Sequence, residues 1–236
     1  YTWYYTYIGN SKAKVVDTWW QTETGGHLIV TLPGLPQKPG KAGLPFYGIQ
    51  AEIVDNSGNP VAPDHKGHLV IKNPWPGALQ DCWQDNQRYQ HYWTTIKPYF
   101  YTGDFAIKDQ DNYIQILGRS DDVISVSGHR IGSAEIENIL VSHPLVIESA
   151  AIGIPNVLTG ESIQIFVTLK PNTKTTSALK TELVNYVHQN FGKHAQITKV
   201  EFIEQLPKTR SGKIMRRLLK AQALNQPLGD TSTLEN

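Results

Sequence analysis

The stretch 118-GRSDDVISVSGHRIGSAEIE-137 decides the fold, because the pattern of the sequence changes within it. The residues before it read as short strands and turns, whereas those after it read as strands mixed with helices. Within the stretch, DVISVS predicts a strand, and Ser133 predicts the N-cap of a helix with glutamates in its first turn. We therefore expect a domain boundary at Ser120–Asp122, with a β-rich segment before it and a small α+β domain after it.

The β-rich segment contains strand patterns separated by turn residues. Asp111-Asn112 marks the turn of a hairpin, because asparagine tolerates the positive φ that such turns need. The run 81–93, rich in aromatic and amide side chains, predicts a helix. The expected strands are 13–17, 27–32, 49–55 and 67–72, followed by the hairpin of 99–109 with 113–119.

The segment after the boundary mixes the two periodicities. Ile136, Ile139 and Leu140 give its first helix an apolar face. The further strands are expected over 146–154, 162–170 and 198–204, and the further helices over 176–190 and 211–223.

Composition limits the class of protein. Hydrophobic residues make up 39% of the 236, enough to bury a core. The single cysteine, Cys82, excludes an internal disulfide and a cysteine metal cluster. The apolar runs are too short to span a membrane and no signal-peptide pattern opens the chain, so we expect no membrane partner and a cytoplasmic location. Because the chain opens at Tyr1 and its only methionine is Met215, we also expect it to be a portion of a longer protein.

The run 207-PKTRSGKIMRR-217 lies in a basic region near the C-terminus. Between Gln205 and Gly229 there are six basic residues and no acid, while the remainder carries 16 basic and 21 acidic residues. This asymmetry indicates an anionic partner or a solvated helix face. A phosphate-binding Walker loop is excluded, because Pro207 and Ile214 stand where glycine and a hydroxyl residue are required. We expect a basic amphipathic helix that begins at Ser211, with Lys213 at its N-terminal tip. A cation at this end opposes the helix dipole, which favours a functional reason for a lysine at this position.

Two further stretches carry polar groups suited to a nucleotide. In 17-DTWWQTETGG-26, adjacent tryptophans on a strand face opposite sides, so one packs inward and the other can line a pocket. The hydroxyls and the carboxylate of Thr22-Glu23-Thr24 suit phosphate and a hard cation, although a core tryptophan before a polar turn accounts for the same residues. Asp104, directly after Gly103, can accept two hydrogen bonds from a vicinal diol, or be an ordinary turn aspartate.

The opening stretch holds candidate ligand contacts as well. Arg119 and Arg130 can each make forked contacts to ribose or phosphate oxygens. Ser127-Gly128 lets a ligand approach the backbone closely. Taken separately, these are ordinary surface residues.

Together and in this order, the four stretches resemble the adenylate-forming enzyme superfamily, and within it the AMP-forming acetate–CoA ligases. The matching residues are DTWWQTETGG, YFYTGD (99–104), GRSDDVISVSGHRIGSAEIE and PKTRSGKIMRR, and the tail GDTSTL (229–234) is similar too. The resemblance implies a mixed α+β fold: the end of a large AMP-binding domain over 1–120, a small mobile domain over 121–225 with a hinge near Asp121, and a tail over 226–236. The family's glycine-rich phosphate loop lies upstream of the matched part, so this portion alone is expected to be inactive.

The implied reaction joins acetate to CoA at the expense of ATP, through acetyl-AMP, with Mg²⁺ as cofactor. In this sequence the resemblance makes Lys213 the catalytic cation and Trp20 the wall of the acyl pocket. It places Asp104 on the ribose hydroxyls and Glu23 on Mg²⁺. The ATP- and AMP-binding residues it implies are Asp17, Thr18, Trp19, Trp20, Gln21, Thr22, Asp104, Arg119 and Arg130.

The resemblance also implies contacts and controls beyond the nucleotide. Ser127 and Gly128 would face CoA, and His188 stands where the family's CoA site has arginine, which puts CoA affinity in doubt. A family loop implies a further metal held by Val141, His143 and Val146, although His143-Pro144 also reads as a helix stop. Acetylation of Lys213 would switch the enzyme off, with a lysine acetyltransferase and a deacetylase as partners.

Two alternatives stay open from the sequence. One is a ligase for propionate or another short acid. The other is a non-catalytic binding module or truncated product, in which the basic helix binds nucleic acid. The absence of aromatic residues among its basic ones argues against that second alternative, because stacking needs them.

Overall fold

The computed structural model describes residues 1–235. The chain divides into two compact units, Tyr1–Ser120 and Asp121–Asn236. No helix in the described part of the chain combines the length and the hydrophobicity needed to cross a membrane.

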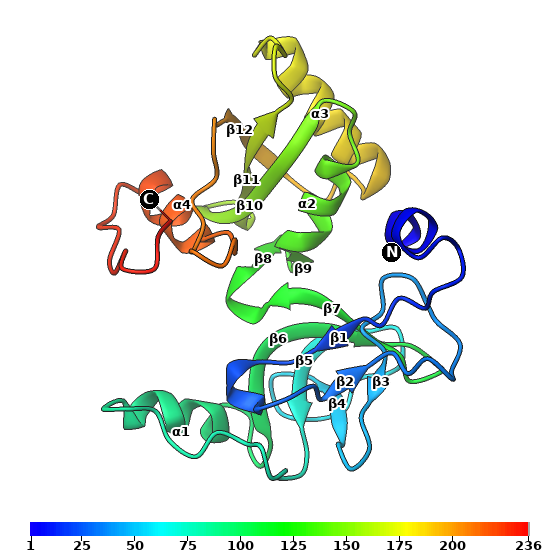
Figure 1. Cartoon of the computed structure of the whole chain (residues 1–236). Helices are drawn as coiled ribbons and strands as arrows, with labels where there is room; N and C mark the ends of the chain where they lie inside the picture. Colours follow the sequence, from blue (N-terminus) through cyan, green and yellow to red (C-terminus); the bar gives the residue numbers. More distant parts are fainter. Residues whose placement is uncertain (236) are drawn as a thin grey trace. The chain divides into compact units, whose positions relative to one another are not determined.

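The first unit is built on two antiparallel sheets (Figure 1). The larger has four strands in chain order: β4 (Ala51–Val54), β5 (Lys66–Ile71), β6 (Phe100–Lys108) and β7 (Ile114–Arg119). The smaller has three: β1 (Thr18–Trp19), β2 (Ile29–Val30) and β3 (Leu44–Pro45). The helical elements are η1 (Tyr4–Ile8), η2 (Thr22–Thr24) and α1 (Asn86–Thr94). Asn112 has φ 67° at the turn between β6 and β7, which confirms the predicted hairpin.

One hydrophobic core joins the two sheets of the first unit. It includes Trp19 of β1, Ile29 of β2, and Phe100, against which Tyr92 of α1 stacks. Backbone bonds tie the sheets directly, since Ile114 N donates to Gly43 O at 2.8 Å and Ala42 N donates to Ile114 O at 2.8 Å. The positions of β1 and β6 are therefore fixed relative to each other, which matters for the polar residues that they carry.

Strand β6 contains a local irregularity at Gly103. Its φ of 72° lies in the left-handed region, where glycine is favoured. A Cβ at this position would lie 2.6 Å from Nη2 of Arg119, so the missing side chain also makes room for that guanidinium. Asp104 follows directly and pairs across the ladder with Arg119.

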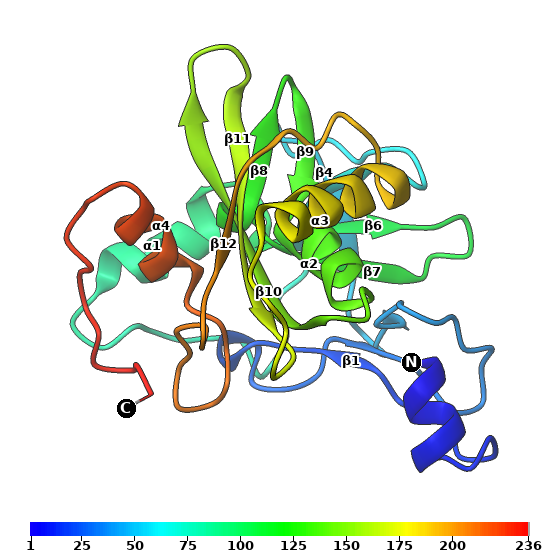
Figure 2. The same cartoon turned by 90° about the horizontal axis from the view of Figure 1, so that it is seen from above.

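The second unit is a five-stranded sheet covered by helices on both faces (Figure 2). The long antiparallel pair β10 (Val146–Asn156) and β11 (Gly160–Leu169) forms its centre, and β12 (Ile197–Phe202) pairs in parallel with β11. The hairpin of β8 (Val123–Val126) and β9 (His129–Gly132) joins β11 through Val126 and Gly160. The helical elements are η3 (Ser120–Asp122), α2 (Ser133–Val141), α3 (Ser177–Asn190) and α4 (Arg216–Ala223).

Alternating side chains on β10 and β11 create a separate core on each face of this sheet. Ala151 and Ile165 pack with α2 and α3 in one core. Ala150, Ile152 and Phe166 pack with Leu219 of α4 in the other. The period of two along the strands thus specifies three layers, with α2 and α3 on one side of the sheet and α4 on the other.

A partly buried ion-pair cluster links α4 to the rest of the second unit. Arg216 donates twice to Glu137 of α2, from Nε to Oε1 at 2.8 Å and from Nη2 to Oε2 at 2.6 Å. Its Nη1 lies 3.2 Å from Oδ2 of Asp122, and Glu137 Oε1 also accepts from Ala151 N at 2.9 Å. Burial lowers the pKa of Arg216, but the bonds to Glu137 and the charge of Asp122 outweigh this and raise it, so the guanidinium is charged.

The structure corrects three predictions. The strand expected over 13–17 is absent from the described chain, where pairing in this region begins at Thr18. Gly132, not Ser133, is the N-cap of α2, and Glu135 Oε2 accepts from Gly132 N at 2.9 Å. The last helix begins at Arg216 rather than at 211, because Met215 N donates to Pro207 O and holds the preceding residues in a turn.

The solvated basic face, expected to include Arg216, Arg217 and Lys220, is confirmed only in part, since Arg217 is exposed but the other two pair with carboxylates. Arg216 is partly buried against Glu137 and Asp122. Lys220 Nζ lies 3.4 Å from Oε1 of Glu161. The basic residues of this region therefore do not form one solvated row, because the helix starts only at Arg216, whose guanidinium bonds to Glu137 of α2.

Replacing Arg216 by methionine should strongly destabilise the second unit. The change keeps most of the volume but leaves the Glu137 carboxylate buried without its partner, at a cost of about 3–5 kcal/mol. Urea unfolding followed by far-ultraviolet circular dichroism would measure the loss. The matched control is Arg210→Met, which changes an exposed arginine of the same region. Equal unfolding free energies for the two variants would contradict a structural role for the cluster.

Replacing Gly103 by alanine should destabilise the first unit. The left-handed backbone alone costs an L-residue about 1–2 kcal/mol, and the new methyl group must also displace the Arg119 guanidinium. Gly34→Ala is the control, because a Cβ there meets nothing within 4 Å. If G103A unfolds at the same urea concentration as G34A, the close approach of Arg119 to β6 is not a real constraint.

Candidate functional site

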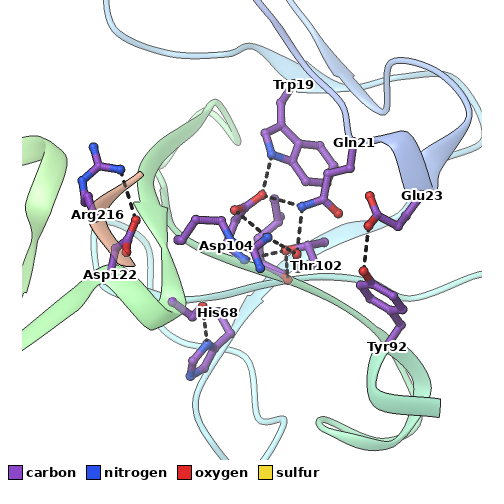
Figure 3. A network of polar contacts seen from close by, with 12 residues as sticks. Trp19, Gln21, Glu23, His68, Tyr92, Thr102, Asp104, Asp122 and Arg216 are labelled. Carbon is purple, nitrogen blue, oxygen red and sulfur yellow. Dashed lines mark hydrogen bonds and ion pairs between the residues drawn. The ribbon is translucent and has the colours of Figure 1, made fainter. Parts of the chain in front are cut away.

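The carboxylate of Asp104 is the centre of a polar cluster in the first unit (Figure 3). The residue is only 6% exposed. Its Oδ2 accepts from Trp19 Nε1 at 2.8 Å and from Gln21 Nε2 at 3.0 Å. Trp19 of β1 and Gln21, two residues after the end of that strand, thus reach across to β6, and the two donors fix the plane of the carboxylate.

Arg119 and Thr102 complete the cluster. Arg119 Nη1 lies 3.5 Å from Asp104 Oδ1 and donates to Thr102 O at 3.1 Å. The same carbonyl accepts from Gln21 Nε2 at 2.8 Å. The Thr102 hydroxyl donates to Leu69 O at 2.8 Å, which ties the cluster to β5. The positions of the side chains in this cluster are therefore set by β1, β5, β6 and β7 together.

One acceptor in this cluster has no partner in the described structure. Gln21 Oε1 is buried and makes no hydrogen bond, while its Nε2 makes two. A buried carbonyl oxygen without a donor is costly, which favours a donor that comes from a ligand. The cluster thus offers acceptors for a hydroxyl-rich group and a guanidinium for an anion, as a nucleotide requires.

Glu23 presents a second carboxylate. Tyr92 of α1 donates its hydroxyl to Oε1 at 2.7 Å, and Arg88 Nη2 lies 3.6 Å from the same oxygen. Burial raises the pKa of Glu23. The hydrogen bond from Tyr92, a backbone hydrogen bond and the charges of Arg88 and Arg119 lower it by more, so the pKa of Glu23 is below its usual value. An ionised carboxylate of this kind suits Mg²⁺ when phosphate oxygens supply other ligands.

The structure separates the two adjacent tryptophans as predicted. Trp19 is 7% exposed and lies in the core, whereas Trp20 is 56% exposed and its ring lies nearly perpendicular to that of His27. Asp17 Oδ1 accepts from Thr18 N at 2.8 Å and orders the start of β1. Thr22 begins η2. Residues 17 to 22 therefore form one continuous edge beside the Asp104 cluster.

Lys213 lies in a tight turn of the second unit, before α4. Thr209 N donates to Lys213 O at 2.8 Å, and Lys213 N donates to the Thr209 hydroxyl at 3.1 Å. Gly212 has φ 81° in this turn. The Lys213 side chain is exposed, so the backbone of the turn decides where its ammonium group can reach.

Further residues that the sequence singled out lie on the β8–β9 hairpin and on α3. Ser127 and Gly128 form the hairpin turn, both with positive φ, and Arg130 follows as an exposed residue of β9. Asp121 lies in η3, where the division between the two units falls. His188 is directed at its own unit, with Nε2 3.1 Å from Ala195 O.

The residues expected to hold a further metal have protein partners. His143 is buried, with Nε2 3.1 Å from Glu182 Oε1, while Nδ1 accepts from Leu145 N at 3.3 Å. Val141 is half exposed and Val146 is buried. Within residues 1–235 no group of three or more His, Cys, Asp or Glu side chains is arranged to hold a metal ion.

Sequence reasoning missed several residues that shape these sites. Thr102 contributes a carbonyl oxygen to the Asp104 cluster, and Tyr92 and Arg88 hold Glu23. Arg216 anchors the helix that follows Lys213. Arg88 and Tyr92 lie four apart on a helix that was predicted, but their partner Glu23 is far away in sequence. No local signal marked these contacts.

Two family models match the chain. The model for AMP-binding enzymes covers residues 1–77, and the model for the AMP-binding enzyme C-terminal domain covers residues 135–213. The solved structure of the anthranilate CoA ligase AuaEII with anthranoyl-AMP matches 94% of this chain and 42% of its own, at 27% identity and a TM-score of 0.79. The ATP-bound RpMatB-BxBclM chimera B1 matches 88% of this chain and 40% of its own, at 27% identity and a TM-score of 0.78.

Curated relatives are similar over almost the whole chain. Acetyl-coenzyme A synthetase of Pyrobaculum aerophilum is 50% identical over 99% of this chain, and that of Marinobacter nauticus is 49% identical over 98%. The chain spans 36% of the length of each of these relatives. From the two family models and these relatives, the chain belongs to the adenylate-forming family of AMP-binding enzymes.

Proposed function

We propose that this chain is the C-terminal part of a ligase that forms acetyl-CoA from acetate, ATP and CoA. Acetate attacks the α-phosphate of ATP to give acetyl-AMP and pyrophosphate, and the CoA thiol then attacks the acyl carbon and releases AMP. The observation that carries the proposal is the Asp104 cluster, whose buried carboxylate and unpartnered Gln21 oxygen suit a ribose and its base. The similarity to acetyl-coenzyme A synthetases supports acetate as the acid.

In the first half-reaction, the first unit would hold the nucleotide. Asp104 would accept hydrogen bonds from the ribose hydroxyls, with Trp19 and Gln21 keeping its carboxylate in place. The edge 17–22 would line adenine and the α-phosphate, and Arg119 and Arg130 would contact ribose or phosphate oxygens. Glu23 would hold Mg²⁺, which neutralises phosphate charge when bound.

Lys213 would be the catalytic cation of this step. The acetate carboxylate and the α-phosphate are both anions and repel each other as they approach. An ammonium group between them offsets the negative charge that gathers in the transition state, which is electrostatic stabilisation and not nucleophilic attack. The exposed position of Lys213 on a tight turn supports this role, because its ammonium group is free to project.

In the second half-reaction, the second unit would present CoA after rotating about Asp121. Ser127 and Gly128 form a turn with exposed backbone, which lets the ligand approach closely. His188 replaces the family's arginine, and its contact with Ala195 O leaves it a weaker phosphate ligand. We therefore expect a higher KM for CoA than an arginine would give.

The basic cluster gives no support to a nucleic-acid function. Arg216 and Lys220 pair with carboxylates of their own unit, and Arg217 donates to Leu228 O at 2.5 Å. Their charges are thus largely used within the fold. Lys213 remains exposed, and its acetylation by an acetyltransferase, reversed by a deacetylase, would remove the charge that the mechanism needs. ATP and CoA as substrates favour a cytoplasmic location.

Replacing Lys213 by alanine in the full-length protein should abolish acetyl-AMP formation and largely spare the second step. Acetate-dependent exchange between ATP and pyrophosphate should fall by about 10²-fold or more, as for loss of a transition-state charge. Thioester formation from supplied acetyl-AMP and CoA should stay within a factor of a few. Lys174→Ala, another exposed lysine, is the control. Equal losses in both half-reactions would exclude a role specific to adenylation.

Replacing Trp20 by glycine should change the acid that is used. An indole at this position leaves room for two or three carbons, and each additional methylene that gains space is worth about 1–3 kcal/mol in selectivity. The ratio of kcat/KM for butyrate to that for acetate should therefore rise at least about tenfold. Trp83→Gly, at another exposed tryptophan, should leave the ratio unchanged. An unchanged ratio in W20G would mean that Trp20 does not line the acyl site.

A further inference from the structure

The C-terminal segment runs back alongside the turn that carries Lys213. Arg210 N donates to Thr233 O at 3.1 Å, and Glu235 N donates to Lys208 O at 2.8 Å. Thr209 and Leu234 lie opposite each other between these two bonds as an antiparallel bridge. We call residues 228–235 the C-terminal strap. Its backbone bonds reach the same few residues that close the Lys213 turn.

The start of the strap is held by α4. Arg217 of that helix donates from Nη1 to Leu228 O at 2.5 Å and from Nη2 to Asp230 O. Gly229 between them has φ 69°, and a Cβ there would lie 3.1 Å from Arg217 Nη1. The guanidinium and the glycine together pin the chain to the helix at this point.

A turn then reverses the strap towards the Lys213 turn. Asp230 Oδ1 accepts from Ser232 N at 2.9 Å, and Leu234 N donates to Thr231 O at 2.9 Å. The bonds from the backbone and side chain of Ser232 lower the pKa of Asp230, and the charge of Arg217 contributes. The GDTSTL run thus has a structural meaning, because its glycine allows the close approach of Arg217, its aspartate closes the turn, and its leucine pairs with Thr209 in the bridge.

Leu234 lies near the far end of the strap and is partly buried. It lines a cavity of about 440 Å³ beside Leu206, Leu218 and Leu228. Leu206 and Leu218 are themselves buried, so the strap rests on the helix and on the segment that leads into the Lys213 turn. The turn is thereby braced on both sides: by the bridge between Lys208 and Ile214, and by the bridge between Thr209 and Leu234.

We propose that the C-terminal strap is a positioning element for Lys213. This proposal rests on the proposed function, in which Lys213 has to reach between two anions. The turn itself is short and its lysine side chain is exposed, so the backbone position determines the reach of the ammonium group. Because a displacement of about 1 Å in a reacting group can cost 10²-fold in rate, loosening the strap should slow adenylation selectively.

The test uses the full-length protein and a matched pair of variants. Glu235→Pro removes the backbone N–H that bonds Lys208 O, whereas Glu235→Ala changes the same exposed side chain and keeps that N–H. A third variant ends the chain after Asp230. Amide hydrogen exchange of residues 208–215 reports on the turn without requiring activity. Exchange between ATP and pyrophosphate, and thioester formation from supplied acetyl-AMP, report separately on the two half-reactions.

The truncated variant should show at least about tenfold faster hydrogen exchange at Arg210, and Glu235→Pro a smaller increase in the same peptide. Both should lower kcat for adenylation with little change in KM for acetate or ATP. Both should leave the thioester step within a factor of about two, and Glu235→Ala should match the parent protein. Unchanged hydrogen exchange in the truncated variant would overturn the proposal that the strap positions Lys213. Faster hydrogen exchange combined with a normal rate of adenylation would overturn it too. If the parent protein shows no adenylation activity, the proposed function is contradicted instead. The hydrogen-exchange data would then still show whether the strap holds the Lys213 turn in place.

Discussion

The buried carboxylate of Asp104 imposes a constraint that the first unit is built to meet. Removing a carboxylate from water costs several kcal/mol unless charged or hydrogen-bonding partners replace the water. Trp19, Gln21 and Arg119 supply those partners from two sheets, and Gly103 provides the space for the guanidinium. The joining of the two sheets and the irregular backbone of β6 both serve one carboxylate, whose orientation is fixed before a ligand arrives.

The second unit solves a similar problem with the opposite charge at the centre. The partly buried Arg216 lies between Glu137 and Asp122, so α4, α2 and the segment at the division between the units share one polar contact. The Lys213 turn is attached to this rigid point at one end and to the C-terminal strap along its side. In the proposed mechanism, a lysine that must reach into a site is placed on a short turn with two well-anchored neighbours.

Much of the fold was predictable from local patterns, whereas the contacts that organise the sites were not. The hairpin of β6 and β7, the pair β10 and β11, and helix α3 follow from alternation, turn residues and apolar spacing. The predicted start of α4 was wrong, because Met215 N donates to Pro207 O and keeps the residues before Arg216 in a turn. The spacing of apolar residues does not indicate such a backbone bond. The Trp19–Asp104 and Arg216–Glu137 contacts join residues 85 and 79 positions apart, and only tertiary packing brings such groups together. Motif order pointed to Asp104 and Lys213, and also to Trp19, Gln21 and Arg119, but it did not show that these three hold the Asp104 carboxylate.

The central claim is that Asp104 reads the hydroxyls of a ribose. It is tested most directly by titrating the full-length protein and its Asp104→Asn variant with AMP and with 2′,3′-dideoxy-AMP. In the parent protein, AMP should bind at least about tenfold more tightly than the dideoxy nucleotide, as expected for hydrogen bonds to a charged acceptor. In the variant that ratio should fall close to one, because the carboxylate is gone. The same ratio in both proteins would contradict the account.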